Sequence, residues 1–468
     1  MGDKGDKPNI LIIVADQLRY DCIGFSRKYP VKTPNIDRLA QEGMWFSNAY
    51  TPIPTCCPAR QSLLSGRRVE SFGALWNYNS GGLMIPAMEP REYSWPRELQ
   101  SRGWRMGYVG KWHVHPKYDP IYYGFDEYVP DWQYSVLRKE KYNKSSDWTK
   151  SWSGEPDPIP VEDSRTHWQA DRVIEMIEKY EQEGKPWHIR LDYNEPHIPC
   201  RPSEPYASMY KPEDIPKWGS FDEEFKNKPY IQRQQLYSWG VENYTWEDWA
   251  PIVALYYGWI TQMDDAIGKV LGTLGRMGIC DNTIVIFTAD HGDMCGGHRM
   301  VDKHYVLYDD IVKVPLIVKW PSVVNEGAIC EKFICNCLDI GPTILDILGI
   351  KADRDFHGRS FLSLLREEDI PNWRTGIVST FNGQQFGLYT TRMIRDNKWK
   401  YIWNTTDVDE LYDLENDPDE LVNLIYEPSY AGLVAEYRKK LYNELLSQGD
   451  GLVSNDWMRH QLLNNRKI

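Results

Sequence analysis

The chain has 468 residues, of which 41% are hydrophobic and 26% charged, and its formal net charge is −13. A chain of this length can bury a large core, so we expect one big domain and a smaller one. The negative balance argues against a nucleic-acid-binding protein, which needs a basic face. An anionic ligand would have to be attracted by a local cluster of Lys, Arg and His.

The nine cysteines are scattered along the chain and lack the spacing of a zinc site. Their odd number and their spread indicate mostly free thiols in a reducing compartment. Residues 1–6 are polar, and the apolar run at residues 10–15 is too short for the core of a signal peptide. No apolar run is long enough to cross a bilayer. We therefore expect a cytoplasmic protein without a membrane span; the alternative is a secreted protein whose leader was trimmed.

The 20 Trp and 30 Tyr residues gather in polar segments as well as in apolar runs. We expect most of them to pack in the core. Exposed aromatic side chains often mark binding surfaces, so those in loops are candidates for stacking against sugar rings.

The chain begins with a strand signal. Residues 9–15 form a continuous β-branched run, which is typical of a strand buried on both faces. Polar residues 16–19 follow, and open α/β sheets place their sites at such carboxyl ends. Residues 33–40 then begin with helix-cap chemistry, and residues 44–50 have the composition of another strand.

Residues 56–66 predict a helix that begins near Cys56. Pro58 suits a first helical turn, where its missing N–H is no loss and its fixed φ is already helical. Gly66 is well placed to end the helix. Cys56 would then lie at the positive end of the helix dipole beside Arg60, where a thiolate or an oxyanion is stabilised.

Strand-like and helix-like segments alternate through the middle of the chain. The predicted strands are residues 104–109, 187–193, 283–288 and 314–320, and the predicted helices are residues 167–184 and 251–277. Irregular, aromatic segments at 116–160 and 206–249 lie between them, and the first is long enough for a lid or a substrate-binding wall. This alternation predicts an α/β fold with a large, mostly parallel sheet sandwiched by helices.

The pattern changes after residue 365. Short segments typical of antiparallel strands, a turn-rich segment and a helix follow, at residues 376–379, 387–392, 399–403, 410–418 and 431–446. We therefore expect a large α/β domain at residues 1–365 and a smaller C-terminal subdomain, an antiparallel sheet plus helix, at residues 366–468.

The pattern Cys56-x-Pro58-x-Arg60, followed by Leu-Ser-Gly, resembles the signature of the type I sulfatases of the alkaline phosphatase superfamily. Ala59 stands where many members carry serine. In that family the cysteine is oxidised to formylglycine, an aldehyde whose hydrate is the nucleophile. The resemblance implies the same modification of Cys56, made by a formylglycine-generating or an anaerobic sulfatase-maturating enzyme.

The same resemblance implies a divalent metal site. Asp16 and Gln17 follow one buried strand and Asp290 and His291 follow another, and these strands are neighbours in the family. A single Asp at a strand end is usually a helix cap or a turn, but with a modified Cys56 the set offers several oxygen ligands. Many sulfatases have Asp and Asn in place of Gln17 and His291. Oxygen ligands suit a hard cation, so calcium is the expected ion. The nitrogen of His291 favours transition ions, which makes manganese the alternative.

Further segments resemble the family's anion-binding parts. Lys111 and His113 lie in a Gly-Lys-Trp-His segment, His197 follows a proline, and Lys303 precedes a Val-Pro-Leu-Ile-Val strand. The family roles are sulfate binding for both lysines, a hydrogen bond to the hydrate for His113, and contact with the ester oxygen for His197. Arg60 would hold the hydrate. Alone, each lysine would be a surface charge and each histidine a core group.

Three functions are considered. The leading one is a sulfatase acting on a sulfated sugar of the glycosaminoglycan type, with Arg19 and loop lysines meeting a second sulfate or a carboxylate. The second is a phosphonate monoester or phosphodiester hydrolase on the same formylglycine scaffold, because those relatives resemble the Gln17 and His291 pattern. The third is a sugar-binding pseudoenzyme whose Cys56 is never modified.

Overall fold

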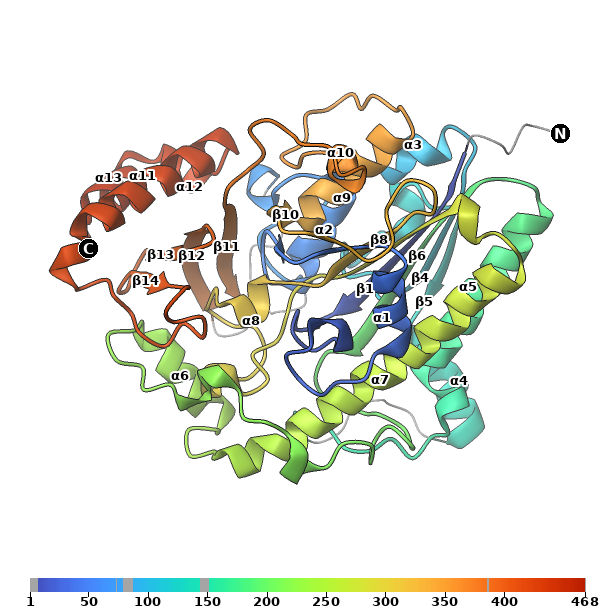
Figure 1. The fold of residues 1–468 in the computed structure, drawn as a ribbon, viewed down its shortest axis with the longest axis horizontal. Helices are drawn as coiled ribbons and strands as arrows, with labels where there is room; N and C mark the ends of the chain where they lie inside the picture. Colours follow the sequence, from blue (N-terminus) through green and yellow to red (C-terminus); the bar gives the residue numbers. More distant parts are fainter. Residues whose placement is uncertain (1–6, 73, 79–86, 144–150, 385–386, 468) are drawn as a thin grey trace.

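The computed structural model describes residues 7–72, 74–78, 87–143, 151–384 and 387–467. Within these ranges a large sheet has the strand order β5-β4-β6-β1-β7-β8-β2-β9 (Figure 1). Neighbouring strands are parallel except at β8, which runs antiparallel to both β7 and β2. The strands are β1 Asn9–Asp16, β2 Met44–Phe46, β4 Arg105–Gly110, β5 Glu127–Pro130, β6 Trp187–Pro196, β7 Thr283–Ala289, β8 Leu316–Lys319 and β9 Ala328–Cys330.

Helices cover both faces of this sheet, because its central strands are apolar on both sides. Every residue of β1 is buried, as is every residue of β7. Figure 1 shows α1, α5 and α7 on one side and α2, α3 and α9 on the other. The helices are α1 Pro34–Gln41, α2 Cys56–Ser65, α3 Pro96–Gln100, α4 Trp132–Tyr142, α5 Arg165–Gln182, α6 Tyr230–Trp239, α7 Trp246–Arg276, α8 Asp309–Val312, α9 Asn336–Ile347 and α10 Leu362–Leu365. The predicted α/β class is confirmed.

The prediction of a single strand at residues 44–50 is wrong. A turn at Ser47 and Asn48 divides it, and the Asn48 side chain donates to the Glu331 backbone carbonyl at 2.9 Å. The second half, β3 (Ala49–Tyr50), leaves the large sheet and pairs with β10 (Ile334–Cys335) instead. The division thus depends on a partner strand almost 300 residues further along the chain.

The long segments predicted to be irregular contain regular structure. Residues 116–160 include β5 and α4, although residues 144–150 lie outside the described part, and residues 206–249 include α6. The helix predicted to begin at residue 251 begins at Trp246, because Thr245 and Asp248 form a capping box. At 31 residues α7 is the longest helix described. Neither it nor any other helix of the described residues is both long and apolar enough to cross a bilayer.

The C-terminal residues form an antiparallel sheet, as predicted, with the order β11-β12-β13-β14. The turn-rich segment predicted at 410–418 begins instead with the fourth strand. One sheet face, including Val378 and Tyr401, packs against Tyr437 and Leu441 of α11 (Figure 1). The expected domain boundary at residue 365 stays a prediction. These elements are β11 Ile377–Gln384, β12 Gly387–Arg395, β13 Trp399–Asn404, β14 Glu410–Asp413, α11 Ala431–Ser447, α12 Gly451–Ser454 and α13 Asp456–Asn464.

Candidate active site

The ends of β1 and β7 bring two acidic residues together. The strands are parallel, and Ala15 is paired with Ala289. Asp16 and Asp290, the next residue on each strand, therefore emerge side by side at the same edge of the sheet. Both carboxylates are fully buried or nearly so. The polar residues after two apolar strands predicted sites at these strand ends, and the resemblance to the sulfatases predicted that the two strands are neighbours.

Helix α2 carries Cys56 to the same edge. The helix begins at Cys56 and ends at Gly66, whose φ of 66° is left-handed and whose N–H donates to the Ser62 carbonyl, so the predicted helix is confirmed. Cys56 Sγ lies 3.2 Å from His291 Nε2 and 3.6 Å from Asp16 Oδ1. The side chain at position 56 is therefore buried among the residues that follow β1 and β7.

Four potential ligands of a metal ion form one buried cluster: the ligand atoms of Asp16, Cys56, Asp290 and His291 all lie within 4.8 Å of one another. His291 Nδ1 donates to the Gly292 carbonyl at 2.9 Å, which leaves the lone pair of Nε2 facing the cluster. Two carboxylates, an imidazole nitrogen and the group at position 56 make a donor set that fits a divalent cation.

Gln17 borders this cluster. Its φ is 67°, and its backbone N–H donates to Asp290 Oδ1 at 3.1 Å. The side-chain amide is held at both ends, because Nε2 donates to Asp293 Oδ2 at 2.7 Å and Oε1 accepts from Lys303 Nζ at 2.5 Å. The amide oxygen therefore lies between the cluster and the Lys303 ammonium group.

Two buried cations offset the negative charge of the cluster. Arg60 Nε donates to Asp290 Oδ2 at 3.0 Å, and its Nη1 donates to Asp192. Lys111 Nζ forms an ion pair with Asp16. Arg60 is fully buried, so it braces the strand ends from inside the protein. Buried charges of this kind are tolerated only when they are paired.

The electrostatic surroundings of Cys56 differ from those of its neighbour. Burial alone would raise the pKa of the Cys56 thiol, but Lys111, Lys303 and His291 together hold that pKa well below its ordinary value. Burial raises the pKa of the adjacent Cys57 thiol. Position 56 is thus the place where this part of the chain stabilises negative charge.

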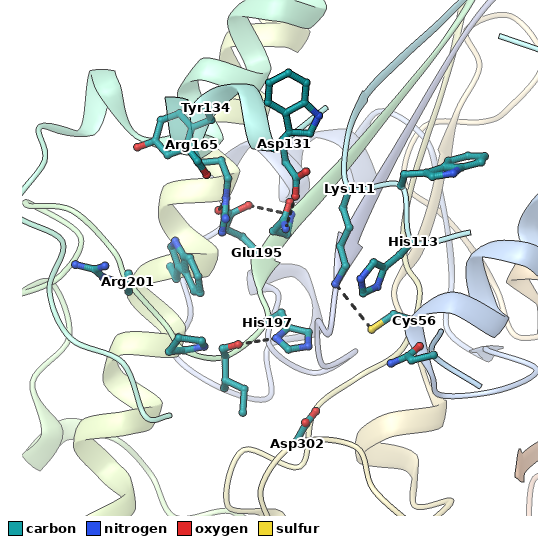
Figure 2. Close-up of a pocket in the computed structure, with 18 of the residues that line it drawn as sticks. Cys56, Lys111, His113, Asp131, Tyr134, Arg165, Glu195, His197, Arg201 and Asp302 are labelled. Carbon is teal, nitrogen blue, oxygen red and sulfur yellow. Dashed lines mark hydrogen bonds and ion pairs between the residues drawn. The ribbon is translucent and has the colours of Figure 1, made fainter. Parts of the chain in front are cut away.

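Cys56 opens into a cavity of about 890 Å³. Figure 2 shows Cys56, Lys111 and His113 on one side of it, His197 in the middle and Arg201 on the opposite side. Lys303 also lines the cavity, and its Nζ lies 2.8 Å from His197 Nε2. Asp16, Gln17, Asp290, His291 and Arg60 lie behind this surface. The sequence-predicted residues of the site, except Arg19, therefore lie in and behind one wall of a single cavity.

The comparisons with known proteins agree with this arrangement. The family model described as "Sulfatase" matches residues 8–350. This chain belongs to the sulfatase family. A second model, described as the C-terminal part of N-sulphoglucosamine sulphohydrolase, matches residues 296–447. The family places the protein in the alkaline phosphatase superfamily and makes it a sulfuric ester hydrolase, as the sequence predicted.

Three relatives of this sulfatase cover nearly the whole chain. It is 30% identical to an arylsulfatase of Clostridium perfringens (strain 13 / Type A), over 95% of this chain and 96% of the relative. It is 28% identical to an ulvan-active sulfatase of Formosa agariphila, over 97% of this chain and 84% of the relative. The structure of the phosphonate monoester hydrolase of Agrobacterium radiobacter is similar, with a TM-score of 0.81, 25% identity, and 94% and 96% of the two chains covered.

Arg19 is the predicted site residue that the sulfatase does not bring to the cavity. Its guanidinium donates to Asp21 at 3.0 Å and to Asp310 at 2.8 Å, and it lies 4.3 Å from the centre of the Trp218 ring. Only 1% of Arg19 is exposed. The predicted contact between Arg19 and substrate does not fit this placement, because all of its charge is used inside the protein.

Two acidic residues of the sulfatase site escaped the sequence analysis. Asp192 accepts from Arg60 and from the Tyr108 hydroxyl, the latter at 2.7 Å. Asp302 lies 3.1 Å from Lys303 Nζ. The signal for Asp192 was available, because Arg190 and Asp192 are charged residues that alternate with apolar ones in the predicted strand. Asp302 had no comparable signal, since it lies in a segment without periodic pattern.

Proposed function

We propose that this sulfatase hydrolyses a sulfate monoester on a sugar, using formylglycine made from Cys56 and a bound divalent cation. The observation that carries the proposal is the cluster of Cys56 with Asp16, Asp290 and His291 at the inner wall of the cavity. The cluster supports the proposal because a thiol, three further potential ligands of a cation and two lysines lie close together at this wall. The maturation would require a formylglycine-generating or an anaerobic sulfatase-maturating enzyme.

The cation would be held by Asp16, Asp290, His291 and the oxygen of a modified Cys56, and the amide oxygen of Gln17 would be a further ligand. When bound, the ion would neutralise negative charge on the sulfate oxygens. Calcium is the proposed ion, since most of these donors are oxygens, and the nitrogen of His291 keeps manganese as the alternative. An unmodified thiol would make the donor set softer, so the choice of ion is tied to the maturation of Cys56.

Other side chains would handle the anion and its protons. Lys111 and Lys303 would bind sulfate oxygens, because both ammonium groups border the space above position 56. The hydrated aldehyde would supply the attacking hydroxyl group. Lys303 is hydrogen-bonded to His197, so the leaving sugar oxygen could receive its proton from Lys303 directly or from Lys303 by way of His197. His113, beside Cys56, would accept a proton as the aldehyde forms again.

A sugar substrate of the glycosaminoglycan type is proposed for two reasons. The cavity is much larger than a sulfate group needs, and its walls include Trp152, Trp239 and Trp259. Flat aromatic side chains of this kind are suited to the apolar faces of sugar rings. The relative named as an ulvan-active sulfatase points in the same direction.

A phosphonate monoester or phosphodiester hydrolase is the second candidate, and one observation favours it. The structure of a phosphonate monoester hydrolase matches this chain with a TM-score of 0.81. Parallel assays of sulfate esters and phosphonate esters with the same aryl leaving group separate the two candidates. The proposal predicts a higher kcat/KM for the sulfate ester.

The deciding experiment produces the protein together with a maturation enzyme, measures the mass of the peptide that contains Cys56, and assays sulfate release from sulfated mono- and disaccharides. We expect an aldehyde at position 56 and free sulfate from at least one sugar. Cys56→Ala should abolish release, whereas Cys57→Ala, a change of the same kind one residue away, should retain most of it. Full turnover by the Cys56→Ala variant would refute the proposal.

A further inference from the structure

Three arginines line the cavity, and they differ in their partners. Arg138 donates to both oxygens of Asp157, at 2.7 and 2.9 Å. Arg165 Nε donates to Glu195 at 2.9 Å. Both of these guanidinium groups therefore belong to ion pairs with carboxylates that are buried or nearly buried.

Among the described residues, Arg201 forms only longer ion pairs. Its nearest carboxylate oxygens are those of Glu155, at 3.5 Å, and Asp157, at 4.0 Å, and neither accepts a hydrogen bond from it. Asp157 is already bound by Arg138, and the Glu155 side chain is 56% exposed, so this contact is solvated and weak.

The Arg201 side chain is nevertheless only 9% exposed. Its Nε has no hydrogen-bond partner among the residues that the structure describes. A guanidinium that has lost water without gaining a hydrogen-bonded carboxylate is costly to keep. An anion that enters the cavity would supply hydrogen-bond acceptors for the Arg201 guanidinium.

Arg201 lies within reach of a substrate that is bound at the reacting group. Arg201 follows His197 by four residues, a stretch that spans at most about 14 Å of extended chain. His197 contacts Lys303, and Figure 2 shows Arg201 across the cavity from Cys56. A molecule with its ester at Lys303 therefore extends toward Arg201 if it is one or two sugar rings long.

We propose that Arg201 binds a second anionic group, a carboxylate or another sulfate, on the sugar that carries the ester. This inference rests on the proposed function. The planar guanidinium offers two parallel N–H donors, which match a pair of oxygens on either group. Because the chain as a whole is acidic, selection of a doubly charged sugar needs such a local cation.

The test compares matched pairs of sulfated sugars in the mature enzyme. One pair is a uronic acid sulfate and the neutral hexose with the same sulfate; the other is a disulfated and a monosulfated hexosamine. We expect kcat/KM to favour the doubly charged member of at least one pair by about 10- to 100-fold, mainly through KM. The preferred pair identifies the group as carboxylate or sulfate.

Arg201→Ala should bring the ratio of kcat/KM between the two members of the pair close to one. Arg201→Lys should retain part of the preference. Arg201→Gln serves if the alanine variant does not fold. Arg233→Ala, an exposed arginine on α6, is the matched control and should leave the preference unchanged. An equal loss for both members of each pair, or an unchanged preference in Arg201→Ala, would overturn the inference.

Failure of the proposed function can be told apart from failure of this inference. Absence of sulfate release from every sugar contradicts the proposed function alone. Calorimetric titration of the same pairs into the Cys56→Ala protein, with and without Arg201→Gln, still measures the contribution of Arg201 to binding. Equal affinities in the two proteins would contradict the role of Arg201, and this measurement does not require catalysis.

Discussion

Lys303 and His197 are joined by a hydrogen bond of 2.8 Å between Nζ and Nε2. The direction of this bond follows from the other ring nitrogen. Nδ1 lies 2.6 Å from the Ile198 carbonyl, which can only accept, so Nδ1 carries the hydrogen and Nε2 accepts from the ammonium group. Asp302 lies on another side of Lys303 and raises its pKa, although burial lowers it. Lys303 is thus a fixed, charged donor at the cavity wall.

Replacement of Lys303 by methionine should therefore lower kcat/KM for sulfate esters by about 100- to 1,000-fold, the usual effect of removing one donor that stabilises developing negative charge. Steady-state kinetics on the mature enzyme measure the loss. Lys332→Met, a change of the same kind at an exposed position, should have no effect. A loss below about threefold for Lys303→Met would show that Lys111 and the cation bind the anion without it.

The sequence was a good guide wherever the signal was local. The β-branched runs that end at Asp16 and Asp290 predicted two buried strands, and Cys56, Pro58 and Gly66 predicted a helix. Each of these features depends on a few adjacent residues and on rules that hold in most α/β proteins. For that reason the central sheet could be expected before the fold was known. The cluster at its edge also required the resemblance to the sulfatases, in which the two strands are neighbours.

Contacts between distant segments could not be predicted in this way. Arg19 was expected to contact substrate, but its partner Asp310 is 291 residues further along the chain. An arginine beside a site has the same local sequence whether or not a distant carboxylate neutralises it. Arg201 illustrates the reverse, because only the folded structure shows that it lacks a hydrogen-bonded carboxylate.

Arg60 should be the residue whose loss destabilises the site most. It is fully buried and pairs with Asp290 and Asp192. Arg60→Met would leave these carboxylates without their cation, which costs about 3–5 kcal/mol for a broken buried pair. Urea denaturation of the variant and of Arg366→Met, an exposed control, measures the difference. A change below 1 kcal/mol would mean that other cations compensate.

Asp290 should be necessary for metal binding. Asp290→Asn keeps the shape of the side chain and removes the negative charge from the buried cluster, so the metal content of the purified protein should fall from about one ion per chain to a small fraction. Elemental analysis by mass spectrometry measures this and also identifies the ion. Asp281→Asn, at an exposed position in the short 3-10 helix that precedes the same strand, is the control. Equal metal content in both variants would place the ion elsewhere.

His188 should make the stability of the protein depend on pH. The side chain lies in β6, Nδ1 donates to the Ile10 carbonyl at 3.2 Å, and burial lowers its pKa from 6.5 to about 3. The folded protein therefore binds fewer protons than the unfolded chain between these values, so His188 lowers the free energy of unfolding as the pH falls below 6.5. At pH 5 this loss amounts to about 2 kcal/mol relative to neutral pH.

His188→Leu should remove this part of the acid sensitivity. We expect the difference in urea midpoint between pH 7.5 and pH 5 to shrink in the variant, even if its stability at pH 7.5 is lower, because leucine cannot take up a proton in either state. His460→Leu, at an exposed position of α13, should leave the difference as it is in the parent protein. If the His188→Leu variant keeps the full pH dependence, other groups account for it, and His188 takes up its proton in the folded protein as readily as in the unfolded chain.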